Sequence, residues 1–291
     1  MDLRAIGMGL AFALMWSSAF TSTHIIVAQA PPLASLSFRF LISGVLGIVL
    51  ALALGQSWRL SRAQWRATIL FGICQNALYL GFNWVAMTTV AASVAAIIAS
   101  TMPLIVGALG WIVFRERLSP LGLFGLIAGF AGVAIIMGAR LQGGVDPHGL
   151  MLCVFGALAL AVATLTVRGA SSGGGGVLMV VGLQMLIGAA VLAVVSGLAE
   201  TISVDVTPKL ATAFIYTILV PGLAATWIWF QLVGRIGAVR AATFHFLTPV
   251  FGVAIAAVVL GEPLDWHDAL GVAVIAGGIL AVQLSKQKVV R

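Results

Sequence analysis

The sequence has very few charged residues. Of its 291 residues, 15 are Lys or Arg and 8 are Asp or Glu, so charged residues make up 8% of the chain and hydrophobic residues 62%. A soluble domain is about one quarter charged, because polar groups must cover its surface. This composition therefore excludes a soluble globular protein, a nucleic-acid-binding protein and a disordered chain. It predicts an integral membrane protein that has the lipid bilayer as a partner.

Cysteines and catalytic motifs are also scarce. The two cysteines, Cys74 and Cys153, lie inside apolar runs and form no redox or metal-binding motif, which excludes a disulfide-stabilised secreted scaffold. The sequence contains no His-x-x-x-His pattern, and no Asp or Glu lies in the middle of an apolar stretch. We therefore expect a protein that is not an enzyme, with no catalytic residue, no cofactor and no metal site.

Ten apolar stretches are each long enough to cross a bilayer as a helix, which requires about 20 residues. They cover about residues 5–28, 33–54, 67–88, 91–113, 121–139, 148–168, 177–199, 210–232, 239–260 and 267–285. The break between the third and fourth stretches contains no charge and is the weakest. We still expect two helices there, because a merged run would be too long for a single crossing. The sequence thus predicts an all-α membrane protein with ten transmembrane helices.

The basic residues are distributed unevenly between the loops. If both termini and every second loop share one side, that side holds twelve Lys and Arg residues, and the other side holds only Arg140 and Lys209. Basic residues of short loops collect in the cytoplasm, so we expect both termini to be cytoplasmic. The net charge of +7 then reflects topology and does not indicate a nucleic-acid partner. The twelve residues are Arg4, Arg59, Arg62, Arg66, Arg115, Arg117, Arg168, Arg235, Arg240, Lys286, Lys288 and Arg291.

The chain contains an internal repeat. Residues 95–132 resemble residues 241–278 at a constant offset of 146 positions and without a gap. The matches include Pro103 with Pro249, Glu116 with Glu262, Gly125 with Gly271 and Gly132 with Gly278. Matches of Ala and Gly are common by chance in so biased a composition, whereas matches of Pro and Glu are not. The segments compared contain the fourth and fifth helices and the ninth and tenth.

Each repeat therefore contains five helices, at residues 1–140 and 147–286, and we expect the two to form one transmembrane domain. Because five is an odd number, the second copy enters the membrane from the opposite side, and the repeats are inverted. Inverted repeats are typical of alternating-access transporters, which bind substrate near the midplane between the repeats. We expect one half to rock against the other during transport.

Several short motifs resemble those of a known family. They are Trp16-Ser-Ser-Ala-Phe, Pro31-Pro32, Arg39-Phe40, and the blocks Pro103…Arg115-Glu116-Arg117-Leu118 and Pro249…Gly261-Glu262-Pro263-Leu264. In combination they resemble the EamA-type transporters of the drug/metabolite transporter superfamily, and within these the exporters of aromatic and neutral amino acids. The resemblance covers nearly the whole chain. It implies a ten-helix fold, a bacterial inner-membrane location, and export of small metabolites or drugs.

The third helix carries a polar stripe on an otherwise apolar surface. At 100° per residue, Gln75, Asn76, Tyr79 and Asn83 fall within an arc of about 100°. Polar side chains inside a membrane are costly and usually face the interior of the bundle. We predict that Asn76, Tyr79 and Asn83 bind substrate. The alternative is that these side chains only form hydrogen bonds between helices.

Tryptophans mark the first and eighth helices. Trp16 lies near mid-depth, too deep for an interfacial belt, and Trp227 shares one face of the eighth helix with Thr217 and Gln231. Pro221, in the middle of the eighth helix, removes a backbone hydrogen bond and favours a kink. We predict Trp16 and Trp227 as substrate-binding residues. Core packing is the alternative for Trp16.

The fourth and ninth helices contain matching prolines. Pro103 and Pro249 follow Ser100 and Thr248, and His245 shares a face with Thr248. Paired interruptions in corresponding segments of the two halves are a sequence signal for a transporter binding site. We predict these five residues as substrate-binding, with the freed carbonyls holding an ammonium group. Simple kinks are the alternative for the prolines, and packing or proton coupling for His245.

The remaining charged residues of interest have structural interpretations. Glu116 and Glu262 end helices on opposite faces of the membrane, so they cannot share one site. We expect each carboxylate to cap loop amides or the start of a helix. Arg39 has few charged partners in its own half. We expect its side chain to snorkel to the membrane surface or to bind loop carbonyls.

Taken with the resemblance, these features predict an exporter of small neutral or zwitterionic metabolites, including aromatic amino acids. Because no carboxylate lies at mid-depth, uniport by alternating access is favoured over proton coupling. The main alternative is a proton-coupled multidrug exporter of lipophilic compounds. An intramembrane enzyme and a channel are disfavoured, because neither a catalytic constellation nor a charged or carbonyl-lined filter is evident. The sequence leaves open whether the protein forms a homo-oligomer.

Overall fold

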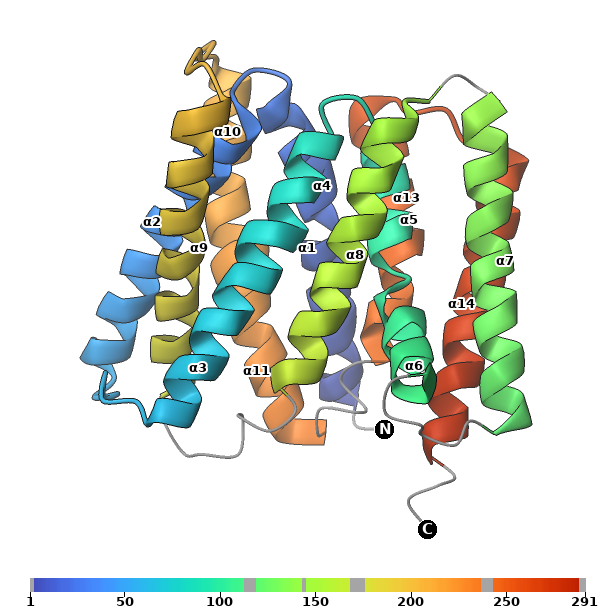
Figure 1. The fold of residues 1–291 in the computed structure, drawn as a ribbon, viewed down its shortest axis with the longest axis horizontal. Coiled ribbons are helices and arrows are strands. Elements are labelled where there is room, and N and C mark those ends of the chain that lie inside the picture. The colour runs from blue at the N-terminus through green and yellow to red at the C-terminus, as the bar shows by residue number, and fades with distance from the viewer. Residues whose placement is uncertain (1–2, 113–118, 143–144, 168–175, 237–242, 288–291) are drawn as a thin grey trace. The chain divides into compact units, whose positions relative to one another are not determined.

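The computed structural model of the protein describes residues 3–112, 119–142, 145–167, 176–236 and 243–287, and all regular elements in these ranges are helical (Figure 1). The chain is an all-α membrane protein with ten transmembrane helices arranged as two inverted five-helix repeats, as predicted. By length and composition, five stretches could cross a membrane alone: Leu3–Val27, Pro32–Ala53, Arg62–Ala86, Leu178–Ala199 and Pro208–Trp229.

The described residues of the first repeat form seven α-helices and one π-helix, because two of its transmembrane helices are interrupted. They are α1 (Leu3–Val27), α2 (Pro32–Ala53), α3 (Arg62–Phe71), η1 (Gly72–Tyr79), α4 (Leu80–Ala86), α5 (Ala92–Ala99), α6 (Met102–Ile112) and α7 (Pro120–Gln142). α3, η1 and α4 form the third transmembrane helix, and α5 and α6 form the fourth. The expected break between the third and fourth helices is confirmed, because α4 ends at Ala86 and α5 begins at Ala92.

The second repeat is interrupted in the same places. Its elements are α8 (Pro147–Val167), α9 (Val177–Ala199), α10 (Pro208–Thr217), η2 (Ile218–Ala224), α11 (Ala225–Ile236), η3 (Thr243–Leu247), α13 (Thr248–Leu260) and α14 (Trp266–Gln287). α10, η2 and α11 form the eighth transmembrane helix. The 3-10 helix η3 and α13 belong to the ninth.

The chain packs into two compact units, and neither unit is one of the repeats. Unit 1 contains Met1–Thr21, Thr89–Leu150 and Ala224–Arg291, and unit 2 contains Ser22–Thr88 and Met151–Leu223. Each unit therefore combines helices from both repeats. Corresponding helices of the two halves thus pack together within one unit, and the expected rocking of one half against the other stays a prediction.

In unit 1, α7 and α14 pack against each other and lie side by side in Figure 1. They cross at glycines, because a Cβ on Gly278 would lie 2.6 Å from the carbonyl oxygen of Gly125, and one on Gly132 would lie 3.0 Å from that of Gly271. Gly125 and Gly132 correspond to Gly271 and Gly278 at the repeat offset. The contact is thus reciprocal, as at an interface with two-fold symmetry.

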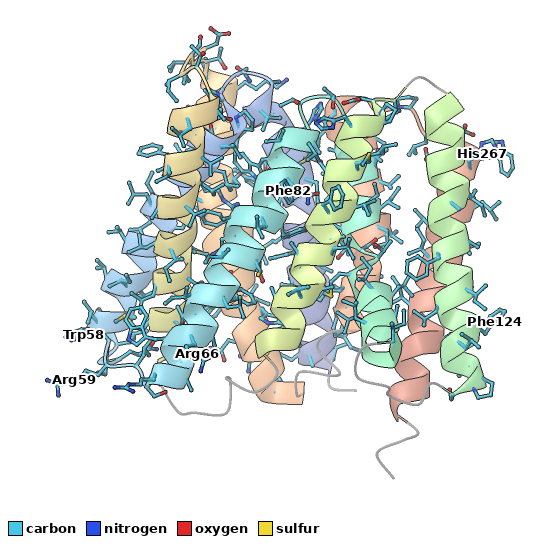
Figure 2. All side chains as sticks on the ribbon, in the orientation of Figure 1. Trp58, Arg59, Arg66, Phe82, Phe124 and His267 are labelled. Atoms are coloured by element: carbon cyan, nitrogen blue, oxygen red, sulfur yellow. The ribbon has the colours of Figure 1, made fainter. Side chains whose placement is uncertain are left out.

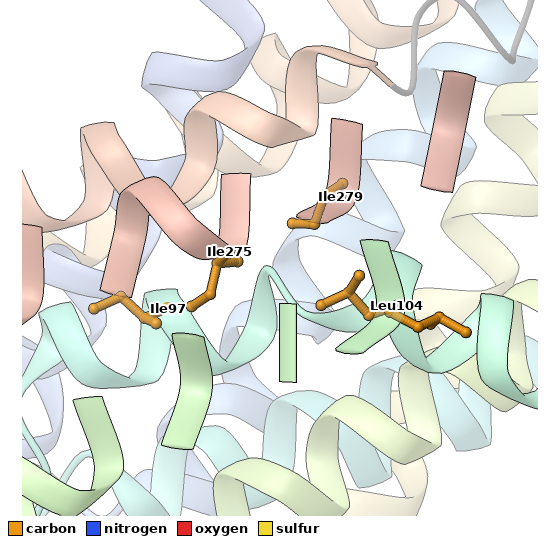
Figure 3. Close-up of a cluster of buried hydrophobic side chains, with 5 residues drawn as sticks. Ile97, Leu104, Ile275 and Ile279 are labelled. Carbon is orange, nitrogen blue, oxygen red and sulfur yellow. The ribbon is translucent and has the colours of Figure 1, made fainter. Parts of the chain in front are cut away.

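The interrupted fourth helix packs on this pair through apolar side chains. Ile97 of α5 and Leu104 of α6 form a buried cluster with Leu126 of α7 and with Ile275 and Ile279 of α14 (Figure 3). Each of these five side chains is at most 4% exposed. In a lipid environment such close van der Waals packing, and not the hydrophobic effect, holds helices together. The cluster therefore fixes both segments of the broken helix.

In unit 2 the corresponding pair is α2 and α9, which also cross at small residues (Figure 1). A Cβ on Gly182 would lie 2.9 Å from the carbonyl oxygen of Gly44, and one on Gly47 would lie 3.3 Å from the Cα of Gly182. Glycine permits backbones to approach this closely in membrane helices. Each unit is therefore built on one pair of repeat-related helices.

Carboxylates cap the first turns of helices in both units. Glu262 accepts hydrogen bonds from the backbone N–H groups of Ala92 (2.8 Å) and Ser93 (3.2 Å) at the start of α5. Glu200 accepts two, at 2.8 Å each, from N–H groups in the first turn of α2. These two bonds confirm the capping role predicted for Glu262. A negative charge is stabilising at a helix N-terminus. Glu116 lies outside the described residues.

We expect Glu262→Ala to lower the stability of the purified protein by about 1–2 kcal/mol, because two N–H groups of α5 lose a charged acceptor. The measurement is the melting temperature in non-ionic detergent. Asp205→Ala is the matched control, because Asp205 is exposed and its bond to the described part of the chain is made by its backbone N–H, which donates to the carbonyl of Gln29 (2.9 Å). An equal decrease in both variants would contradict the capping role.

Basic and aromatic side chains gather at one end of unit 2. Trp58, Arg59 and Arg66 lie where α2 ends and α3 begins (Figure 2). Ser61 caps α3 in a capping box, in which Ser61 accepts from the N–H of Gln64 and the Gln64 side chain accepts from the N–H of Ser61. Tryptophan and arginine at a helix end are typical of a membrane–water interface.

Candidate functional site

Two transmembrane helices contain a π-helical stretch, in which backbone hydrogen bonds join residues five positions apart. η1 begins at Gly72 in the third helix, and η2 begins at Ile218 in the eighth. These starts are separated by the repeat offset of 146 residues. π-helical segments are rare and frequently lie at functional sites. The pair extends the internal symmetry to helices whose sequences match only faintly.

The fourth and ninth helices are irregular next to the matched prolines. The fourth is broken at Ser100 and Thr101, and Pro103 is the second residue of α6. In the ninth, the 3-10 helix η3 becomes α-helical at Thr248, with Pro249 second in α13. Irregular backbone at membrane depth is tolerated only where protein buries it or where it lines a water-filled cavity. Both irregularities lie in unit 1.

Beside the second irregularity, unit 1 contains a cluster of aromatic rings. The imidazole of His245, in η3, lies 5.0 Å from the ring of Phe12, 5.1 Å from that of Trp229 and 5.9 Å from that of Trp16, measured between centroids. Phe12 also contacts Trp229 at 4.8 Å and Trp16 at 5.9 Å. All three contacts of His245 are edge-to-face, the geometry that aromatic quadrupoles favour. The cluster joins α1, α11 and η3.

The hydroxyl groups near the irregularities differ in their hydrogen bonds. Ser100 donates to the carbonyl of Ile97 (2.6 Å) and so uses its proton within its own helix. The Thr248 hydroxyl is buried and has no hydrogen-bond partner among the described residues. Pro249 is buried beside it, whereas the side chain of Pro103 lies outside the described part of the chain. A buried polar atom without a partner is costly, so Thr248 is the group most available to a ligand.

In unit 2 the side chains of Asn76, Tyr79 and Asn83 in the polar stripe of the third helix are buried, whereas Gln75 is half-buried, and Asn76 bonds to another helix. The Asn76 side-chain amide donates to the backbone carbonyl of Gln184 in α9 (2.9 Å). Gly188 leaves space for it, since a Cβ there would lie 2.5 Å from that of Asn76. This contact corresponds to the alternative for Asn76, a hydrogen bond between helices.

Tyr79 and Asn83 form the second part of the stripe. Tyr79 is 2% exposed, and the Asn83 amide nitrogen donates to the backbone carbonyl of Tyr79 (2.9 Å). The Asn83 side-chain oxygen is buried and has no hydrogen-bond partner within the described ranges. Gly156 of α8 packs against both, since a Cβ there would lie 2.5 Å from that amide nitrogen. Asn83 thus retains one unused acceptor.

A cavity of about 770 Å³ lies between α1 and α11 in unit 1. Trp227 lines this cavity and is 57% exposed. It is not a member of the aromatic cluster of Phe12, Trp16, Trp229 and His245. Two guanidinium groups and one amide supply its polar lining. The lining residues are Arg4, Gly7, Met8, Ala11, Trp227, Ile228, Gln231 and Arg235.

Comparison with known proteins identifies the family. The model of the EamA-like transporter family matches the chain twice, at residues 3–138 and 147–284. The chain belongs to the EamA-like transporter family. Each match contains five of the ten transmembrane helices. This EamA-like protein is therefore a multi-pass membrane transporter.

Relatives of this EamA-like transporter match over most of their length. It is 28% identical over 276 residues to the uncharacterized transporter YvbV of Bacillus subtilis (strain 168), covering 94% of this chain and 90% of YvbV. It is 27% identical over 300 residues to a Salmonella typhimurium (strain LT2) protein named "Probable amino-acid metabolite efflux pump", covering 94% and 92%. A solved structure named "Crystal structure of protein" has the same fold, with a TM-score of 0.69 and 24% identity over 99% of both chains.

The predicted site residues of this EamA-like transporter fall into two groups, one in each unit. Trp16 and His245 are brought together in the aromatic cluster of unit 1, and Thr248 follows His245 by three residues. Unit 1 contains Trp16, Ser100, Pro103, Trp227, His245, Thr248 and Pro249, and unit 2 contains Asn76, Tyr79 and Asn83.

Sequence reasoning missed several residues of unit 1. Phe12 and Trp229 complete the aromatic cluster, and Arg4 and Arg235 line the cavity. One signal was available, because Phe12 lies four residues before Trp16 and so shares its face of α1. The sequence alone does not distinguish such rings from rings that face lipid.

The expectation that Arg39 snorkels to the surface is wrong. Arg39 is 7% exposed in unit 2, and its guanidinium carbon lies 5.4 Å from the ring centroid of Phe40 and 6.0 Å from that of Trp84. Its Nε has no hydrogen-bond partner among the described residues. Aromatic side chains from its own helix and from α4 hold the cation inside the unit.

Proposed function

We propose that this transporter exports small neutral or zwitterionic metabolites, namely amino acids including aromatic ones, across the bacterial inner membrane. The supporting observation is the cluster of Phe12, Trp16, Trp229 and His245 beside the irregular start of the ninth helix. Aromatic pairs contribute about 0.5–1.5 kcal/mol beyond area burial, so a substrate ring that stacks here gains affinity over an aliphatic one.

Polar groups for the remainder of an amino acid lie in the same unit. The Thr248 hydroxyl is buried without a partner among the described residues. The break between α5 and α6 interrupts regular helix bonding, and the hydroxyls of Ser100 and Thr101 donate there to the carbonyls of Ile97 and Ile98. In transporters with inverted repeats, such unwound carbonyls and helix ends hold the charged groups of the substrate. The name of the Salmonella relative agrees with this substrate class.

Uniport is the mechanism that the distribution of acids favours. The six Asp and Glu residues that the structure describes lie in loops or in the first turn of a helix, and the other two, Asp2 and Glu116, lie outside the apolar stretches of the sequence. Proton-coupled transporters carry ionisable groups inside the membrane. We propose that alternating access moves the substrate down its own gradient. We also propose that both termini are cytoplasmic, as the twelve basic residues on that side indicate.

The test is flux from liposomes that contain the purified full-length protein, loaded with a panel of radiolabelled neutral amino acids, with and without an imposed pH gradient. We expect saturable flux that does not depend on the gradient. Flux that requires the gradient would overturn uniport and support proton coupling. Flux of lipophilic compounds without flux of amino acids would favour the multidrug alternative.

We expect Trp16→Leu to weaken the apparent affinity for phenylalanine and tryptophan about tenfold, or about 1.4 kcal/mol. Alanine or leucine flux should change little, because aliphatic side chains make no ring contact with the cluster. Trp58→Leu is the control, since Trp58 is 63% exposed in the loop after α2. Equal losses for aromatic and aliphatic substrates would assign Trp16 to core packing.

A further inference from the structure

Two buried polar side chains of α2 have hydrogen-bonding capacity that the described residues do not use. Arg39 is 7% exposed and Ser43 is 1% exposed. Neither Nε of Arg39 nor the hydroxyl of Ser43 has a hydrogen-bond partner among the described residues. The two residues lie four positions apart and therefore share one face of α2. A buried polar group without a partner is costly, so two on one helix face indicate a ligand.

The positive charge of Arg39 also lacks a carboxylate partner within the described ranges. The rings of Phe40 and Trp84 stabilise the guanidinium through cation–π contacts, but an aromatic ring does not neutralise a charge. A buried charge that is neither paired nor fully hydrogen-bonded costs free energy. Ionisable residues that are retained inside a membrane at such a cost usually mark a substrate or ion pathway.

Both side chains lie beside the same residue of η2. A Cβ on Gly222 would lie 3.8 Å from Nη2 of Arg39 and 3.8 Å from Oγ of Ser43. Because Gly222 has no side chain, nothing from this position of η2 fills the space next to the two donors. η2 is π-helical and contains Pro221, and irregular backbone at membrane depth is tolerated where protein buries it or where it lines a cavity. Unit 2 thus places a cation and a hydroxyl together beside an irregular helix.

We propose that Arg39 and Ser43 bind the carboxylate of the transported solute, on the side of α2 that faces η2. This inference deepens the proposed function and rests on it, because it names the group of the solute that unit 2 recognises. A guanidinium donates to both oxygens of a carboxylate through its planar fork, which favours arginine for this group. The Ser43 hydroxyl supplies a further donor. An amide in place of the carboxylate has nearly the same shape but no charge, and it binds less well.

Two probes with one phenyl ring separate charge from shape. 3-Phenylpropionate carries a carboxylate, and 3-phenylpropionamide is its neutral counterpart. The measurement is equilibrium binding of each radiolabelled probe to the purified full-length protein in non-ionic detergent and sulfate buffer. We expect the acid to bind at least about tenfold more tightly than the amide, or by about 1.4 kcal/mol. Equal binding of the two probes would overturn the proposal.

The decisive variant is Arg39→Met, which we expect to remove the preference for the acid and to leave binding of the amide unchanged. Arg66→Met is the matched control, because it removes one exposed charge at the start of α3. We expect it to retain the full preference. Equal weakening of acid and amide by Arg39→Met would make Arg39 a packing residue. Loss of the preference in Arg66→Met would assign the effect to net charge. Either result would overturn the proposal.

Ser43→Ala tests the site without removing the cation. We expect the preference for the acid to decrease about threefold and not to disappear, because one neutral hydrogen bond to the carboxylate is lost. Ser37→Ala is the control on the same helix, because the Ser37 hydroxyl already donates to the backbone carbonyl of Ala189 (2.8 Å). It should retain the preference of the wild type. Equal decreases in both serine variants would contradict a carboxylate site at Ser43.

Binding and flux fail independently, so the two proposals can be distinguished. Amino-acid flux from liposomes without any acid preference in binding would refute this site and leave the proposed export standing. An acid preference that depends on Arg39, without amino-acid flux, would retain the site and refute amino acids as the solute. A small inorganic anion offers similar chemistry to Arg39. A preference that disappears when chloride replaces sulfate would assign Arg39 to such an ion and overturn the proposal, whereas a preference in both buffers supports it.

Discussion

Gly278→Leu is expected to prevent stable folding of unit 1. A Cβ at this position would lie 2.6 Å from the carbonyl oxygen of Gly125 and 2.6 Å from the backbone nitrogen of Gly129. These are backbone atoms, so no side chain can rotate away, and α7 and α14 must separate. Overpacking of this kind costs about 3 kcal/mol or more. We expect little protein that survives size-exclusion chromatography in non-ionic detergent, and a large decrease in the melting temperature of what remains.

Gly277→Leu is the matched control for that result. It introduces the same side chain one position earlier on α14, where Gly277 is exposed and no atom lies within 4 Å of an added Cβ. Leucine also has a higher helix propensity than glycine. We expect normal yield and an unchanged or slightly higher melting temperature. Similar losses in both variants would show that leucine is not tolerated anywhere in this part of α14, and would contradict a role for the close crossing.

The sequence predicted the features of the fold that depend on composition and on local pattern. Ten helices follow from the lengths of the apolar runs, and the inverted arrangement follows from an odd number of helices in each repeat. The Glu262 cap could be predicted because a carboxylate after a helix needs amide partners. The pairing of α7 with α14 and of α2 with α9 could not be predicted, because small residues such as Gly132 and Gly278 do not specify which helix they will meet.

The sequence did not predict the π-helical form of η1 and η2, although Pro221, which lies inside η2, indicated an irregularity in the eighth helix. Their starts at Gly72 and Ile218 obey the repeat offset, yet the residues around them match only faintly. Whether a helical segment forms α-helical or π-helical hydrogen bonds depends on the atoms of other helices that pack against it. Gly72 illustrates this, because a Cβ there would lie 2.8 Å from the carbonyl oxygen of Gln184 in α9. Such a contact appears only after the chain has folded.

The candidate site was predicted in part. Trp16 and His245 stand out because large or polar groups at mid-depth are unusual, whereas Phe12 is one of 15 phenylalanines and carries no such signal. The error on Arg39 has a physical cause. Snorkelling was expected because few charged partners are close in sequence, but Trp84 comes from another helix and provides an aromatic surface for the cation.

We expect Arg39→Met to decrease transport without lowering the stability of the protein. Among the described residues, no carboxylate pairs with Arg39. Burying an unpaired charge inside a protein costs several kcal/mol, because the charge loses its contact with water. Methionine retains the unbranched stem and removes the charge. We therefore expect the melting temperature to be unchanged or higher. We expect amino-acid flux to decrease at least about tenfold, since ionisable residues inside a membrane usually serve function.

The position of Arg39 in unit 2 gives this expectation its mechanism. A Cβ on Gly222 of η2 would lie 3.8 Å from Nη2 of Arg39 and 3.8 Å from Oγ of Ser43, whose hydroxyl also has no partner within the described ranges. The cation therefore lies beside the π-helix of the eighth helix, where backbone hydrogen bonding is already irregular. Arg39→Lys keeps the charge but loses the planar fork of donors, so we expect its flux to lie between those of the wild type and Arg39→Met. Measurement of melting temperature and flux on the same preparations distinguishes the roles. A variant that melts far lower than the wild type and transports normally would make Arg39 a packing residue, because a functional cation should affect flux first.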